Sequence, residues 1–230
     1  MDERYHLLYA AAAVRGHLIR LGLFDKLGKE LSERELPELT REDCERLLEL
    51  GREQEIKLYH FKRSDRMLPR VHKVLGFLKG IYFENLLDVG SGRGVFLLPF
   101  LDEFPYAEVT SLDILDKRVK LLEDISVGGV KRLSVKKASI CDKPFPDDSF
   151  DVVTMLEVLE HIPDVEGAIR AAVKMSRNYV IVTVPSKEDD NPEHIHLLTK
   201  EVLTRYFNAC GVTKLSFDGV PGHLFMIAKI

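Results

Sequence analysis

The 230-residue sequence has few of the features that mark secreted or membrane-spanning proteins. Its three cysteines, Cys44, Cys141 and Cys210, form no close pair, which excludes a disulfide framework or a zinc knuckle and favours a reducing compartment. The longest early apolar run, residues 7–14, is far shorter than the roughly 18 to 20 residues that cross a bilayer. The Asp-Glu-Arg start at residues 2–4 has the wrong charge for a secretory signal. These absences predict a cytoplasmic protein without a membrane partner.

A basic charge excess is also missing, since 37 acidic and 33 basic residues leave a net charge of −4. The chain therefore lacks the overall positive field that would indicate binding to nucleic acid. The chain is 45% hydrophobic and 30% charged, which is enough apolar material for a sizeable core and excludes disorder as its main state. Its length predicts one large domain, or one domain with an appendage.

The first 82 residues carry apolar positions at helical spacing and no strand-like run. About three helices are expected, over residues 7–21, 40–51 and 71–78. We expect residues 1–82 to form an N-terminal helical segment that serves as a lid, in substrate recognition or in homodimer formation. The rest of the chain, residues 83–230, is expected to form the main domain.

One part of the helical segment is strongly basic. Residues 57–79 hold seven bases and one acid, whereas residues 30–55 hold ten acids and four bases. The basic stretch is either a surface for phosphate or RNA, or a solvated helix face that opposes the acidic helix before it. The second interpretation is favoured because runs of charge are usually solvent-facing.

From residue 83 onward, strand and helix signals alternate along the chain. Strands are expected at 85–90, 108–112, 133–140, 150–156, 179–184, 212–217 and 224–230, and helices at 95–104, 115–125, 164–176 and 199–208. Alternation of this kind predicts an α/β fold with a mostly parallel seven-stranded sheet and helices on both faces. Only a turn separates the last two strands, which makes the last strand antiparallel.

The first of these strands runs directly into three glycines, Gly90, Gly92 and Gly94. A dinucleotide fingerprint would need glycine at the position of Val95, and no Gly-Lys-Ser/Thr follows to form a phosphate-cradling loop. The strand also ends in Asp88, whose carboxylate would repel a pyrophosphate but suits a cationic amino group. The pattern favours a nucleoside-bearing cofactor without phosphates and speaks against a nicotinamide-dependent oxidoreductase.

A second acid, Asp113, ends the next strand, 25 positions after Asp88. A carboxylate at this place can accept hydrogen bonds from ribose hydroxyls. The alternative is that Asp113 caps the helix that follows. The ribose role is favoured because of the glycine turn upstream.

Taken in order, these residues and two later runs resemble a known family. The runs are Pro-Phe-Pro-Asp-Asp-Ser-Phe-Asp-Val-Val at 144–153 and Glu-Val-Leu-Glu-His-Ile-Pro-Asp at 157–164. Residues 84–230 resemble a class I S-adenosylmethionine-dependent methyltransferase. The resemblance implies a Rossmann-like fold, S-adenosylmethionine as cofactor, and methyl transfer to an acceptor that is a small molecule or an RNA. It names no catalytic residue, because the sulfonium methyl is already activated and the protein mainly aligns the acceptor.

The same resemblance assigns the cofactor-binding positions. Asp88 would orient the amino group, Gly90 and Gly92 would pass under the methionine part, and Asp113 would hold the ribose. The full set is Asp88, Gly90, Ser91, Gly92, Asp113, Ile114, Ser139, Ile140 and Glu157. Ile114 would pack on the adenine, and Ser139 stands where the family commonly has an acid. The N–H of Ile140 would serve an adenine ring nitrogen.

Two carboxylates and two imidazoles raise the alternative of a divalent metal. Glu157, Glu160, His161 and the later His194 are similar in order to two metal-using groups, which methylate an RNA 2′-hydroxyl or a catechol-type hydroxyl. The other interpretation is that these residues order the loop or contact substrate, while His194 and His196 cap a helix. The second interpretation is favoured, so no metal ligand is assigned.

A rival of a different class is a non-catalytic module that keeps the fold and binds the cofactor only as a regulator, or binds none. The intact Gly90, Gly92 and Asp113 argue against it.

Overall fold

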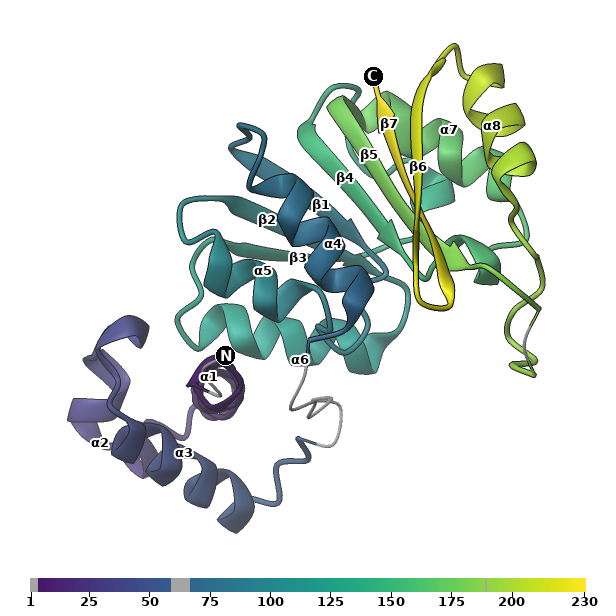
Figure 1. The fold of residues 1–230 in the computed structure, drawn as a ribbon. Helices are drawn as coiled ribbons and strands as arrows, with labels where there is room; N and C mark the ends of the chain where they lie inside the picture. Colours follow the sequence, from purple (N-terminus) through teal and green to yellow (C-terminus); the bar gives the residue numbers. More distant parts are fainter. Residues whose placement is uncertain (1–3, 59–66, 189) are drawn as a thin grey trace.

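The computed structural model describes residues 4–58, 67–188 and 190–230. Within them a seven-stranded sheet runs in the order β3-β2-β1-β4-β5-β7-β6 (Figure 1). Its strands are β1 (Asn85–Val89), β2 (Glu108–Asp113), β3 (Leu133–Lys137), β4 (Phe150–Leu156), β5 (Ser176–Pro185), β6 (Lys214–Val220) and β7 (His223–Lys229). The β5–β7 and β6–β7 pairs are antiparallel, and the other four pairs of this sheet are parallel. The predicted mostly parallel sheet with an antiparallel last strand is confirmed.

Two hydrophobic cores lie on the two faces of this sheet. One contains the apolar residues of α4 (Pro69–Leu78), α5 (Leu97–Glu103) and α6 (Asp116–Val127). The other contains those of α7 (Val165–Met175) and α8 (Lys200–Ala209). Strands between two helical layers are buried on both sides, which explains their continuous apolar runs. In β1, for example, Leu86 belongs to the first core and Leu87 to the second.

The third strand is shorter than predicted. It ends at Lys137 instead of residue 140, because the Ser139 side chain accepts a hydrogen bond from the N–H of Cys141 and starts the short 3-10 helix η2 (Ile140–Asp142). A serine cap of this kind competes with strand pairing for the same backbone. Ser139 and Ile140 therefore lie just beyond the carboxyl end of the strand.

The N-terminal segment holds more helices than the sequence predicts. Besides α4, it contains α1 (Arg4–Arg20), α2 (Phe24–Glu33), the 3-10 helix η1 (Leu36–Glu38) and α3 (Arg41–Glu53). The estimate of about three helices is wrong, because it omits α2. Gly28 interrupts α2 with a φ of 70° and a ψ of 160°, which breaks the helical period although Leu27 and Leu31 are buried.

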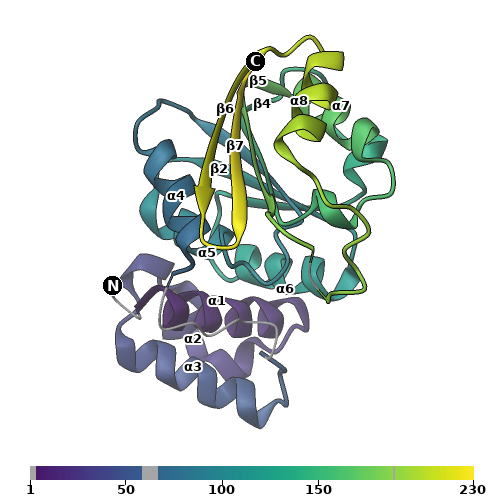
Figure 2. The ribbon, with the colours of Figure 1, turned by 45° about the vertical axis from the view of Figure 1, so that its right-hand side comes forward.

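Close packing fixes α1, with α2 and α3 against it, to the outer side of α6 (Figures 1 and 2). A Cβ at Gly16 would lie 1.8 Å from the carbonyl oxygen of Asp124, and one at Gly128 would lie 1.8 Å from that of Ala12. Between them the buried Arg15 donates from Nε to the carbonyl of Gly128 at 2.8 Å. The apolar residues of α1 also join the core that contains α5 and α6. The segment and the sheet thus share one core.

Part of the basic stretch 57–79, residues 59–66, lies outside the described residues. Of the described bases, Lys73 pairs with Asp218 and Lys79 pairs with Glu103 at 2.8 Å. These pairs link α4 to β6 and to α5, and neither partner belongs to the acidic residues 30–55, so the role of the basic stretch stays a prediction.

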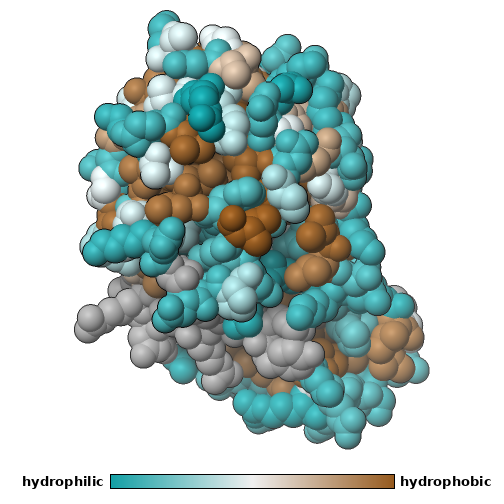
Figure 3. Space-filling model, turned by 90° about the vertical axis from the view of Figure 1, so that its right-hand side faces the viewer, coloured by the Kyte–Doolittle hydropathy of each residue, from teal (hydrophilic) through white to brown (hydrophobic). Residues whose placement is uncertain are grey.

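A hollow of about 520 Å³ lies between α4 and the β6–β7 hairpin and is lined in part by Phe77, Phe225 and Ile227. The face of the molecule in Figure 3 shows hydrophobic patches separated by hydrophilic side chains. None of the helices in the described part of the chain is long and apolar enough to cross a membrane.

Candidate functional site

The tight turn after β1 lies at the carboxyl ends of the central strands. Gly90 and Gly92 take left-handed backbone angles, with φ of 66° and 58°. A Cβ at Gly90 would lie 2.6 Å from a methyl group of Val158, whereas the nearest atom to a Cβ at Gly92 would be 3.6 Å away. Gly90 is therefore required by space and by conformation, and Gly92 by conformation. The N–H of Gly90 donates to the carbonyl of Leu112 at 2.6 Å, which ties the turn to β2.

Ser91 is used inside this turn. Its hydroxyl donates to the carbonyl oxygen of Asp88 at 3.1 Å and accepts from the Ser111 hydroxyl at 2.8 Å. Both serine side chains are buried. The Ser91 hydroxyl thus fastens the turn to β1 and β2. Its predicted contact with the cofactor stays a prediction.

Asp88 lies under the turn with 2% of its surface exposed. The Thr154 hydroxyl donates to its Oδ1 at 2.8 Å, while its buried Oδ2 has no hydrogen-bond partner among the described residues. Burial raises the pKa of Asp88 to about 6, although the Thr154 hydroxyl at Oδ1 and the nearby Ser91 hydroxyl act in the opposite direction. A buried acceptor of this kind would be satisfied by a cationic donor, such as the amino group of the predicted cofactor.

Asp113, at the end of β2, is also buried. Its Oδ2 accepts from the N–H of Gly92 at 3.1 Å, and its Oδ1 accepts from the N–H of Leu115 at 2.9 Å. The N-cap of α6 is Leu115, so Asp113 does not cap that helix. Next to it, Ile114 is 62% exposed, as a side chain that packs on a bound ring would be before binding. The structure thus brings the glycine turn, the two acids and Ile114 together.

Two further predicted cofactor residues follow β3. The half-buried Ser139 caps η2, and Ile140 is the first residue of that helix, with 3% of its surface exposed. The first N–H groups of a helix have no partner within it. The N–H of Ile140 is therefore of the type that the predicted contact with the adenine ring needs.

Glu157 follows β4 directly and has a left-handed φ of 59°. Its Oε1 accepts from the Thr183 hydroxyl at 2.9 Å, and its Oε2 lies 3.0 Å from Nε2 of His223. Its own N–H donates to the Thr183 carbonyl at 2.9 Å. Glu157 therefore joins β4 to β5 and to the start of β7.

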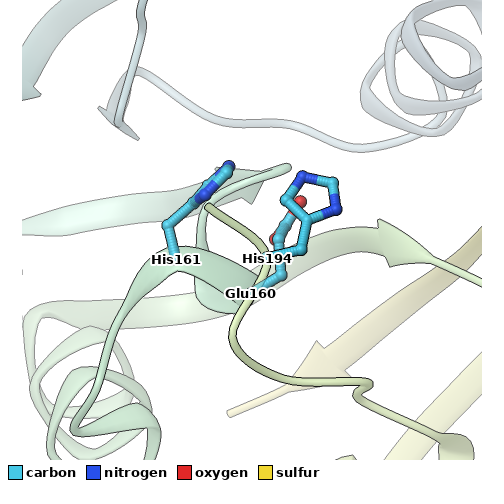
Figure 4. Close-up of side chains that lie close together, drawn as sticks. All are labelled: Glu160, His161 and His194. Carbon is cyan, nitrogen blue, oxygen red and sulfur yellow. The ribbon is translucent and has the colours of Figure 1, made fainter. Parts of the chain in front are cut away.

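Glu160, His161 and His194 meet beside the site, where the 3-10 helix η3 (Leu159–His161) faces the loop after β5 (Figure 4). One ligand atom from each lies within 4.8 Å of the others, and Glu160 is fully buried. Nδ1 of His161 lies 2.9 Å from the carbonyl of Glu193, an arrangement that leaves Nε2 as the lone-pair nitrogen. Of the four ligands considered from the sequence, three come together, and Glu157 is held elsewhere.

Sequence reasoning missed four residues of this site: Thr154, Thr183, His223 and Arg118, whose Nη1 lies 3.6 Å from Oδ2 of Asp113. The two threonines interrupt the apolar runs of β4 and β5, and that signal could have identified them as partners of buried acids. His223 and Arg118 carry no comparable signal, because polar residues at the start of a strand or in the first turn of a helix are ordinary.

Comparison with known proteins agrees with this geometry. Residues 87–181 match the family model described as a methyltransferase domain. The chain is 30% identical over 115 residues to a ubiquinone biosynthesis O-methyltransferase of Idiomarina loihiensis, an alignment that covers 45% of this chain and 46% of that enzyme. It is 28% identical over 171 residues to the 27-O-demethylrifamycin SV methyltransferase of Amycolatopsis mediterranei, covering 70% of this chain and 58% of that enzyme. The chain spans about half the length of the curated relatives it matches.

Solved structures show the same fold. An S-adenosylmethionine-dependent methyltransferase of Aquifex aeolicus superposes with a TM-score of 0.59 at 21% identity, covering 74% of this chain and 94% of that one. One from Archaeoglobus fulgidus superposes with a TM-score of 0.58 at 18% identity, covering 70% and 91%. This chain thus has the fold of solved S-adenosylmethionine-dependent methyltransferases, and its residues 87–181 match the methyltransferase domain family.

Proposed function

We propose that this protein transfers the methyl group of S-adenosylmethionine to a small-molecule or RNA acceptor. The observation that carries the proposal is the buried Oδ2 of Asp88, which has no hydrogen-bond partner among the described residues and lies beneath a left-handed glycine turn. A cationic amino group at this place would satisfy an oxygen whose burial otherwise costs free energy. The exposed Ile114 and the buried Asp113 complete a site for adenosine.

The bound cofactor supplies an activated methyl group, and the chain's own residues supply its position. Asp88 would orient the amino group, Gly90 and Gly92 would let the methionine part lie close to the backbone, and Asp113 would accept from the ribose hydroxyls. Alignment of this kind lowers the barrier of a displacement by reducing the entropy that the reacting groups lose. For an acceptor that must lose a proton, a base is needed at the acceptor side of the same edge.

A calorimetric titration with S-adenosylmethionine tests the cofactor site. We expect binding by the wild type and at least a tenfold loss in Asp88→Ala, because the amino group loses its buried partner. Glu49→Gln removes the same charge from the exposed face of α3 and should bind like the wild type. Absence of binding by the wild type would contradict the proposal.

A screen with radiolabelled methyl groups against total RNA, protein extract and small-molecule pools then identifies the acceptor. Label in one pool would support an enzyme and name the acceptor class. Cofactor binding without label in any pool would favour the non-catalytic module. The cytoplasmic location and the homodimer expected from the sequence stay predictions.

A second candidate function is metal-assisted O-methylation, and the Glu160, His161 and His194 group favours it. Two imidazoles and a carboxylate would hold Mg²⁺ or Mn²⁺, which would polarise an acceptor hydroxyl. Titration with Mn²⁺ should show one site in the wild type, and His194→Ala should lose it. His72→Ala, an exposed histidine on α4, is the matched control.

The position of Glu157 sharpens this test. Since Thr183 and His223 occupy both of its oxygens, Glu157→Gln should leave Mn²⁺ affinity within about twofold of the wild type. No Mn²⁺ binding by the wild type would contradict the second candidate and leave the first in place.

A further inference from the structure

Arg118 lies against the two parts of the site that hold the predicted ribose. It is the third residue of α6, and its Nη1 is 3.6 Å from Oδ2 of Asp113. A Cβ at Gly92 would lie 3.7 Å from the same nitrogen. The guanidinium therefore covers the glycine turn on the side where that turn donates to Asp113.

The stability of α6 does not account for an arginine at this position. The N-terminal turn of a helix carries a partial positive charge, so a cation there is unfavourable by roughly 0.3–1 kcal/mol. Lys117, the preceding residue, is also a cation in this turn, but it is exposed and has no ion pair in the described part of the chain. Arg118 differs from it by its contact with the buried acid.

Asp113 needs such a partner. Only 2% of its side chain is exposed, whereas 36% of the Arg118 side chain is exposed. A carboxylate removed from water costs several kcal/mol unless charge and hydrogen bonds compensate it. The N–H groups of Gly92 and Leu115 bind one oxygen each, and among the described residues Arg118 is the one cation within 4.0 Å.

We propose that Arg118 is a positioning residue for the cofactor ribose, which acts through Asp113 and the Gly92 turn. The inference rests on the proposed function, since it assumes that Asp113 binds the ribose hydroxyls. The guanidinium holds Oδ2 in place, so that the remaining lone pairs of the carboxylate point toward the two hydroxyls. An arginine fits this role better than a lysine because its planar donors are pre-organised.

The test compares two ligands, S-adenosylhomocysteine and its analogue with a 2′,3′-dideoxyribose, by calorimetric titration. In Arg118→Met we expect the first ligand to bind 5- to 20-fold more weakly and the second to change by less than twofold. The difference arises because the analogue lacks the hydroxyls that Asp113 would bind. Arg118→Lys should lose less than Arg118→Met, and Lys117→Met, the matched control, should bind both ligands as the wild type does.

The outcomes separate this inference from the proposed function. Equal losses for both ligands, or no loss for either, would overturn the role of Arg118 while cofactor binding stands. If the wild type binds neither ligand, the proposed function fails and the inference fails with it. If Arg118→Met does not fold, the ratio of the two affinities in Arg118→Lys decides, and a ratio equal to that of the wild type overturns the role.

Discussion

Replacement of Asp88 by asparagine tests how this buried carboxyl makes the stability of the fold depend on pH. Burial raises the pKa of this carboxyl from 3.8 to about 6. The folded state therefore binds a proton more tightly than the unfolded state between pH 4 and 6. Stability must then fall as the pH rises through this window, and the loss is complete above the folded pKa.

The size of the effect follows from the shift. About two pKa units correspond to about 3 kcal/mol, and no discount for solvent is needed because the carboxyl is buried. An asparagine side chain keeps an oxygen that can accept the hydrogen bond from the Thr154 hydroxyl. Unlike the carboxyl of Asp88, it does not ionise. Its amide brings an unpaired N–H that costs about 1–3 kcal/mol, but this cost does not depend on pH.

We expect the difference in unfolding free energy, wild type minus Asp88→Asn, to fall by about 2 to 3 kcal/mol between pH 4 and pH 7.5. Chemical denaturation across this range measures it, and the acids with lowered pKa, such as Asp43 and Asp218, cancel in the difference. Glu49→Gln should show no such trend. A difference that stays constant, or that rises with pH, would refute the reasoning about Asp88.

Three further changes probe the site and its support. Gly90→Ala should cost several kcal/mol of stability and abolish cofactor binding, because the new methyl group would lie 2.6 Å from the Val158 side chain and the residue has a left-handed φ. Thermal melts measure the loss of stability, and calorimetric titration measures the loss of binding. Arg15→Met should destabilise the fold by about 3 kcal/mol in chemical denaturation, because buried carbonyls lose their donor, and an unchanged midpoint would contradict this. His223→Ala should cost about 1 kcal/mol, since Glu157 keeps its other hydrogen bond, and a loss above 3 kcal/mol would show a larger role for the pair.

Much of the fold follows from local patterns in the sequence. Strand and helix alternation predicts the sheet because buried parallel strands need continuous apolar residues and the crossover helices need one apolar face. The glycine turn was predictable because left-handed backbone favours glycine at Gly90 and Gly92. The missed helix α2 shows the limit of this approach, since Gly28 breaks the period on which the prediction depends.

The partners of the site side chains depend on the order of the strands, which local pattern does not encode. Glu157 meets Thr183 and His223 because β4 pairs with β5, and β5 pairs with β7 in a register that opposes Pro185 to His223. Because of that pairing, Glu157 binds Thr183 and His223 and is not part of the group of Glu160, His161 and His194, although Glu157 and Glu160 are three residues apart. The sequence by itself determined the class of fold and the glycine turn with its two acids, since these rest on residue type and spacing along the chain, whereas S-adenosylmethionine as cofactor came from the resemblance to a known family. Only the tertiary structure decided the partners of Asp88 and Glu157, because the sheet brings Thr154, Thr183 and His223 to these acids from distant parts of the chain.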